Sequence, residues 1–82
     1  MKNDLCICIM NYNNNDGALL LAKQFSQYSD FVFITDSGSD QQHWYFHKTD
    51  APFYRGNLDK ASSLFFNTNC KGCLYICSDV VI

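Results

Sequence analysis

Residues 31–40 read FVFITDSGSD, and this stretch decides the fold that the rest of the chain is expected to adopt. Its first five residues are all aromatic or β-branched, which is typical of a strand buried on both faces of a parallel sheet. The next five are small, polar and turn-forming, so Asp36, Gly38 and Asp40 follow this strand directly. In open α/β sheets, ligands bind beyond the carboxyl ends of the strands. We therefore expect residues 36–40 to lie at the functional edge of the molecule.

The length and composition of the chain restrict its class. Its 82 residues can form at most one domain, and 48% hydrophobic with 17% charged residues is typical of a globular protein. The formal net charge of −2 and the scattered Lys and Arg residues disfavour nucleic acid as a partner. The apolar run at residues 5–10 is too short for a signal peptide or a transmembrane segment, so a cytoplasmic location is expected.

Strands and helices are predicted to alternate along the chain. Apolar and aromatic runs predict four strands, at residues 5–10, 31–35, 43–48 and 73–77. Apolar residues at helical spacing predict two helices, at about residues 18–28 and 57–67, the second capped by Asn57. The order β-α-β-β-α-β predicts an α/β fold in which helices flank a mostly parallel four-stranded sheet.

The end of the chain affects how its domain organisation is interpreted. After Ser78 and Asp79 the sequence stops in an apolar stretch, residues 80–82, with no further helix to cover the last strand. Such an end would expose apolar surface and backbone groups of a type that is normally buried. We therefore expect residues 1–82 to form a single partial domain of a truncated chain.

Polar clusters follow three of the apolar runs in a fixed order: Asn11-Tyr12-Asn13, Asp36-Ser37-Gly38-Ser39-Asp40 and Ser78-Asp79-Val80. This ordered set resembles the nucleotide-sugar-binding half of the GT-A glycosyltransferases, in particular the inverting family 2. The resemblance covers nearly the whole chain, but only the first part of such an enzyme. It implies a Rossmann-like segment that binds the donor of an inverting, metal-assisted sugar transfer to an acceptor.

The resemblance also implies what each half of the enzyme does. The family keeps its general base in the acceptor-binding half, which has no counterpart here. No catalytic residue is therefore assigned, and this piece alone is expected to lack transferase activity.

The resemblance implies binding roles for individual residues. Asn11 and Tyr12 correspond to positions where the family's first strand meets the base and ribose of a nucleotide-diphosphate sugar, with a UDP-sugar as the expected donor. Asp36 corresponds to the family's acidic residue that accepts a hydrogen bond from the base. Gly38 lies in the same turn and is assigned to the same nucleotide-sugar site.

Asp79 corresponds to the last acid of the family's Asp-x-Asp motif, which holds Mg²⁺ or Mn²⁺ against the pyrophosphate of the donor. A hard cation held by carboxylate oxygen neutralises a diphosphate leaving group without proton transfer. The motif here reads Cys77-Ser78-Asp79, so the first acid is absent. Asp79 would share the cation with the phosphates.

Each polar cluster also has a structural interpretation. Residues 36–40 could form a solvated turn, because Asp, Ser and Gly are common turn formers, and Asp79 could cap the end of a strand. All three clusters, however, follow apolar strands and should converge on one edge of a parallel sheet. This convergence favours a binding site.

Five cysteines support an alternative, in which the chain is a small non-catalytic binding module with a zinc-thiolate site. Their odd number excludes a complete disulfide framework, and Cys70-x-x-Cys73 has the spacing of a zinc knuckle. Cys6 and Cys8 should share one face of the first strand, and Cys73 and Cys77 one face of the last. If the two strands are neighbours, the thiols could gather. Against this, Cys6, Cys8 and Cys77 lie among Ile and Leu, where a free cysteine behaves as a small hydrophobe.

Other phosphate-binding and signalling classes lack their motifs. The chain contains no G-x-G-x-x-G and no G-x-x-x-x-G-K-[ST], so dinucleotide-binding and P-loop proteins are disfavoured. A receiver-type signalling domain would place paired acids directly after the first strand, and Asn11-Tyr12-Asn13 does not supply them.

Overall fold

The computed structural model describes residues 4–40, 43–49 and 53–79. Six elements follow one another along the chain: β1 (Leu5–Asn11), α1 (Asn15–Phe25), β2 (Phe31–Asp36), β3 (His47–Lys48), α2 (Phe53–Phe66) and β4 (Gly72–Cys77). The strands form one sheet in the order β3-β2-β1-β4, and every strand pair among these residues is parallel. The predicted α/β class and the order β-α-β-β-α-β are confirmed.

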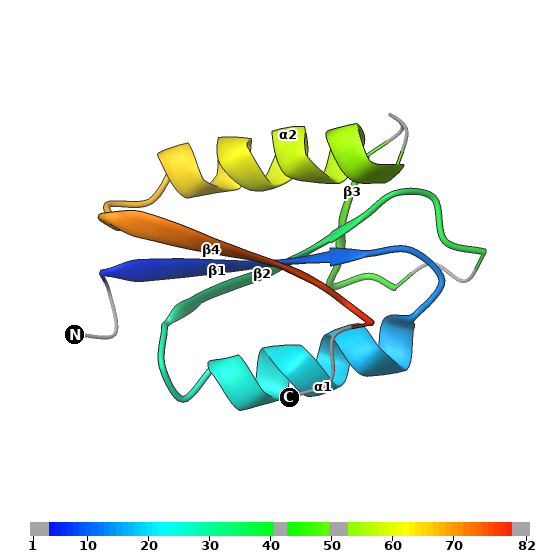
Figure 1. Ribbon diagram of the computed structural model, residues 1–82, viewed down its shortest axis with the longest axis horizontal. Helices are drawn as coiled ribbons and strands as arrows, with labels where there is room; N and C mark the ends of the chain where they lie inside the picture. Colours follow the sequence, from blue (N-terminus) through cyan, green and yellow to red (C-terminus); the bar gives the residue numbers. More distant parts are fainter. Residues whose placement is uncertain (1–3, 41–42, 50–52, 80–82) are drawn as a thin grey trace.

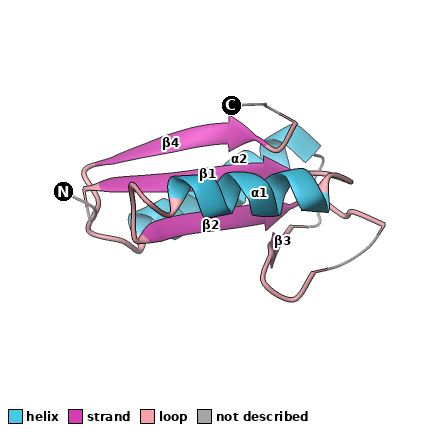
Figure 2. Cartoon of the chain, turned by 90° about the horizontal axis from the view of Figure 1, so that it is seen from below, coloured by secondary structure: helices cyan, strands magenta, loops and turns pink. Residues whose placement is uncertain are grey.

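The two helices cover opposite faces of the sheet. Figure 1 shows α2 above the strands and α1 below them, and Figure 2 shows α1 lying along β1 and β2. This arrangement follows from parallel pairing, because each crossover must return the chain to the same end of the sheet and places its helix over one face. The carboxyl ends of the strands are therefore left uncovered by either helix.

Strand β1 is the centre of the core, with β2 on one side and β4 on the other. All of its residues after Leu5 are buried, and successive side chains point to opposite faces of the sheet. Ile7 and Ile9 belong to the cluster under α1, whereas Cys6 and Cys8 belong to the cluster under α2. One face of the central strand is thus aliphatic and the other carries thiols.

Two hydrophobic clusters hold the layers together. The buried residues of the α1 cluster are Ile7, Ile9, Ala18, Leu21, Ile34 and Phe46. The α2 cluster is smaller: its buried residues are Cys6, Cys8 and Ala61, and the partly buried side chains packed against them are Phe31, Phe33, Phe65, Cys70 and Cys73. Aliphatic packing is therefore concentrated between β1 and α1.

The prediction of a strand at residues 43–48 is wrong for most of its length. Only His47 and Lys48 pair with β2, opposite Thr35 and Asp36. The preceding residues form a turn, in which the Phe46 N–H donates to the His43 carbonyl at 3.1 Å. Phe46 is buried in the α1 cluster, but Trp44 is 89% and Tyr45 43% exposed, so these two side chains lack the burial that favours aromatic residues in strands.

The predicted helix boundaries also need correction. Helix α2 begins at Phe53, so Asn57 is not its cap but a fully buried interior residue whose Nδ2 donates to the Asn11 carbonyl at 3.2 Å. Helix α1 runs from Asn15 to Phe25, and Tyr28 lies beyond its end with 65% of its surface exposed. Both helices thus begin earlier than predicted. Polar residues that suit a cap or a loop, such as Asn15 in α1 and Asn57 in α2, also fit within a helix whose apolar face packs on the sheet.

Within the described residues, neither helix has the length and apolar character needed to cross a membrane. The cytoplasmic location expected from the sequence stays a prediction.

Candidate functional site

The carboxyl ends of β1, β2 and β4 lie side by side. Asn11 is the register partner of Asp36, and Met10 is the partner of Cys77. The chain that follows each strand therefore emerges at the same edge of the sheet. The polar clusters around Tyr12, Asp36 and Asp79 share this edge, as the sequence predicts.

Asp36 is a buried carboxylate at the centre of this edge, with only 1% of its surface exposed. Its Oδ1 accepts a hydrogen bond from Asn11 Nδ2 at 3.0 Å and another from the Ser39 hydroxyl. Its Oδ2 accepts the backbone N–H of Ser39 at 3.1 Å. The interpretation of residues 36–40 as a solvated turn is therefore wrong for Asp36, whose buried carboxylate holds the turn by hydrogen bonds to Ser39.

Ser39 connects this turn to the loop after β1. Its hydroxyl accepts the backbone N–H of Asn13 at 2.7 Å, and the Asp40 N–H donates to Asn13 Oδ1 at 2.8 Å. Asn13 has a φ of 55°, a left-handed conformation that asparagine tolerates better than most residues. The loops after β1 and β2 therefore form one hydrogen-bonded unit, although their residues lie 26 or 27 positions apart in the sequence.

Asn14 connects the same loop to the end of β4. Its Nδ2 donates to the Ser78 carbonyl at 2.9 Å, and the Ser78 N–H donates to the Met10 carbonyl at 2.9 Å. A Cβ at Gly17 would lie 2.5 Å from Asn14 Nδ2 and 2.8 Å from the Ser78 oxygen, so only glycine fits there. The Asn14 side-chain amide thus bonds to the residue that follows β4, and it makes no cap hydrogen bond to α1.

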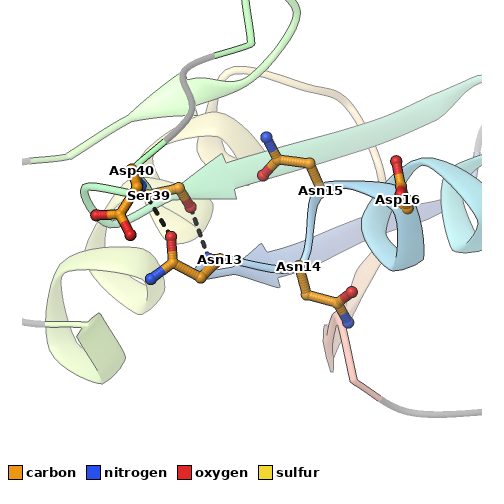
Figure 3. Close-up of a pocket in the computed structure, with 6 residues that line it drawn as sticks. All are labelled: Asn13, Asn14, Asn15, Asp16, Ser39 and Asp40. Carbon is orange, nitrogen blue, oxygen red and sulfur yellow. Dashed lines mark hydrogen bonds between the residues drawn. The ribbon is translucent and has the colours of Figure 1, made fainter.

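A polar depression of about 480 Å³ opens beside these loops. It is lined by Asn13, Asn14, Asn15, Asp16, Ser39 and Asp40 (Figure 3). In Figure 3 the Asn13 side chain points toward Asp40, whose N–H it accepts, and the Asn13 backbone N–H donates to the Ser39 hydroxyl. Carboxylate and amide oxygens are ligands that suit hard cations such as Mg²⁺. No basic side chain is among these lining residues.

The five residues assigned from the sequence lie beside this depression and do not line it. Tyr12 is 49% exposed, and Gly38 is exposed with a φ of 79° and no heavy atom within 4 Å of a Cβ built on it. Asn11 and Asp36 are buried behind the loops, and Asp79 is exposed after β4. Among the described residues, no group of three potential metal ligands includes Asp79.

The lining residues that the sequence analysis missed belong mostly to one polar run. Residues 13–16 read NNND and follow the first strand after a single residue, Tyr12. That position could have identified them, because the segment after a parallel strand lies at the ligand-binding edge. The role of Ser39 depends on a hydrogen bond to the distant Asn13, which no local pattern reveals.

His47 lies near this edge and responds to pH. Burial lowers its pKa below the ordinary value of 6.5, and the positive charge of Lys60 lowers it further. The unfolded chain therefore takes up a proton near pH 6.5, whereas the folded state resists it until a lower pH. We therefore expect neutral His47 to contribute its full stability above pH 6.5. The free energy of unfolding should decrease as the pH falls below this value.

Urea unfolding at several pH values on either side of 6.5 measures this dependence. A His47→Phe variant is the control, because it keeps a ring against Phe33, whose ring centroid lies 5.6 Å from that of His47. The variant should lose less stability than the parent on acidification. An equally steep loss in both proteins would assign the effect to other groups.

Comparisons of the chain with protein-family models, with curated proteins and with solved structures find no match. The geometry of the sheet edge, together with the resemblance seen in the sequence, is therefore the basis of the functional proposal.

Proposed function

We propose that this chain is the donor-binding segment of a glycosyltransferase of the GT-A type, and that it binds a nucleotide-diphosphate sugar, a UDP-sugar, at the carboxyl edge of its sheet. The main support is that the polar residues after β1, β2 and β4 gather at that edge beside a depression of about 480 Å³. Parallel α/β sheets bind ligands at this position. No general base is proposed among the described residues, so the proposal concerns donor binding.

The base and ribose of the donor are proposed to contact Tyr12 and the turn after β2. The ring of Tyr12 is half exposed and offers an apolar face on which a base can stack. The Asp36 carboxylate uses three acceptor positions internally, out of about four that two carboxylate oxygens provide. Because only 1% of the Asp36 surface is exposed, we propose that this residue contributes by holding the turn that faces the base. Gly38 leaves open space through which the donor can approach the backbone.

The pyrophosphate of the donor is proposed to lie near Asp79 and the start of α1. A helix N-terminus favours negative charge, and α1 begins at this edge of the sheet. The carboxylates of Asp16 and Asp40 line the depression and repel phosphate. A cation is therefore needed to offset this negative charge when the pyrophosphate binds. We propose that Mg²⁺ or Mn²⁺ is shared by Asp79 and the phosphate oxygens.

A titration with UDP in the presence of Mn²⁺, followed by calorimetry, tests this proposal. Tyr12→Ala should weaken binding by about 1–3 kcal/mol, the usual loss when a stacked aromatic is removed. Asp79→Asn should remove the dependence of binding on Mn²⁺.

Tyr28→Ala is the matched control, because Tyr28 is also an exposed tyrosine but follows α1 near the start of β2, at the opposite end of the sheet. It should bind UDP as the parent does. The proposal is wrong if the parent shows no saturable UDP binding, or if the Tyr12 and Tyr28 variants lose affinity equally.

A further inference from the structure

Three thiols lie together under α2, at the end of the sheet opposite to the proposed donor site. The sulfurs of Cys6 and Cys8 are 3.7 Å apart, and those of Cys8 and Cys73 are 3.5 Å apart. All three sulfurs lie within 4.8 Å of one another. Cys6 and Cys73 are register partners near the start of β1 and β4, which brings together residues from the two ends of the chain.

We propose that Cys6, Cys8 and Cys73, with Cys70 as the fourth ligand, form a structural site for Zn²⁺. Zinc bound tetrahedrally at Zn–S distances of about 2.3 Å holds its sulfurs about 3.8 Å apart. The observed separations of 3.5 and 3.7 Å are close to this edge length. Strands β1 and β4 therefore already bring three sulfurs together, and two of their separations are close to those that zinc requires.

Cys70 is the ligand that must turn toward the ion. It lies in the connection between α2 and β4, is partly exposed, and packs against the buried cluster that contains Cys6 and Cys8. Its spacing to Cys73, with two residues between, is common in zinc sites. The backbone of this connection is held in place, because the N–H groups of Lys71 and Gly72 donate to the Asp4 carbonyl at 2.8 and 3.3 Å. We propose that rotation of the Cys70 side chain brings its sulfur to the ion.

The chemistry of the cluster distinguishes it from the proposed donor site. Its ligand set consists of thiols without carboxylate or imidazole, which suits Zn²⁺ and disfavours Mg²⁺ or Mn²⁺. Burial, with a smaller contribution from the neighbouring Cys73, raises the pKa of the Cys6 thiol to about 12, and burial also raises the pKa of Cys8. Without metal these thiols are neutral and tolerated in the core. Zinc binding releases their protons, so the affinity should increase with pH.

Two structural alternatives explain the cluster less well. All five cysteines are free, and a disulfide requires sulfurs about 2.05 Å apart, well below the separations seen here. Simple packing explains one buried cysteine, but it does not require three sulfurs from two strands to lie within 4.8 Å of one another. Three converging thiols are better explained by a shared ligand.

The ion can reach the cluster without opening the sheet. Strand β4 is an edge strand, and Leu74 and Tyr75 beside Cys73 are 41% and 36% exposed. Cys70 and Cys73 are themselves only partly buried, whereas Cys6 and Cys8 are fully buried. The bound ion would connect β1, the α2–β4 connection and β4. For a small domain, such a link adds stability that a limited core does not provide.

A titration of the metal-free 82-residue chain with Co²⁺ in the presence of a non-thiol reductant tests the site. We expect a single equivalent of Co²⁺ to give the strong visible bands of tetrahedral cobalt and a thiolate charge-transfer band, both removed by Zn²⁺. Zn²⁺ should also raise the Tm. Cys70→Ser and Cys73→Ser should each weaken Zn²⁺ binding by at least the roughly 10–100-fold loss seen when an outer-shell partner is removed.

Cys77→Ser is the matched control, since Cys77 lies on β4 but outside the cluster. It should bind Co²⁺ and Zn²⁺ as the parent does. The site is refuted if the parent shows only the weak bands of octahedral cobalt, or if Cys77→Ser weakens binding as much as Cys73→Ser. It is also refuted if Cys70→Ser, which changes a partly exposed side chain and whose folding can be verified by circular dichroism, keeps the full affinity.

Discussion

Replacing Ile9 with alanine should lower the free energy of unfolding by about 2–5 kcal/mol, the usual cost of truncating a large buried aliphatic residue. Ile9 is fully buried on the central strand, in the cluster that joins β1 to α1. The loss combines less apolar burial with a cavity that close-packed neighbours cannot fill. Because small domains are stable by only about 5–15 kcal/mol, this single change should leave a substantial part of the protein unfolded or close to unfolding.

Urea unfolding followed by far-ultraviolet circular dichroism measures this effect. The fluorescence of Trp44 is a poor alternative, because that side chain is already 89% exposed in the folded state. Leu20→Ala is the control: Leu20 lies on α1 but is 58% exposed, so its loss should stay within about 0.5 kcal/mol. Equal losses for the two variants would contradict the packing described for β1 and α1.

Replacing Asp36 with alanine should destabilise the fold as well as weaken UDP binding. From the sequence alone, Asp36 is expected to act on the ligand with little effect on folding. The structure shows a buried carboxylate that accepts hydrogen bonds from Asn11 and Ser39. Each buried donor left without an acceptor costs about 1–3 kcal/mol. We therefore expect a loss of at least this size in urea unfolding.

Two controls separate the roles of Asp36. Asp36→Asn keeps one carbonyl oxygen and the shape of the side chain, so it should lose less stability than Asp36→Ala. Asp40→Ala removes a neighbouring but exposed carboxylate and should change stability by no more than about 0.5 kcal/mol. If Asp36→Ala is as stable as Asp40→Ala, the hydrogen bonds at the end of β2 do not hold the turn.

Local sequence patterns predicted the long strands more reliably than the short one. Strands β1, β2 and β4 were predicted because their continuous apolar runs require burial on both faces. Strand β3 was overestimated, because His43-Trp44-Tyr45-Phe46 has strand-like composition but forms a turn. Asn57 was taken as a helix cap because asparagine favours that position, yet it donates to the carbonyl of Asn11 on β1. For Asn57, a contact between distant segments decided the outcome.

The candidate site was predictable in position but not in detail. Parallel pairing requires the segments after β1, β2 and β4 to share an edge, and the sequence was enough to expect this. The exchange of hydrogen bonds among Asn13, Ser39 and Asp40, and the contact of Asn14 with Ser78, could not be predicted. These bonds depend on the exact loop geometry and join residues more than 25 positions apart. For the three sulfurs under α2, the sequence left their gathering open because it depended on β1 and β4 being neighbours, and the structure shows that they are.

By itself, the sequence determined the α/β class, the order of the elements and the edge at which the polar residues gather, because strand burial and chain direction are encoded locally in apolar runs and in the turns between them. Only the tertiary structure decided that Asp36 is a buried anchor, that residues 13–16 line the depression, and that Cys6, Cys8 and Cys73 meet while Cys77 does not. The physical reason is that burial and hydrogen bonding of a polar side chain depend on neighbours brought close by folding, which no local pattern specifies.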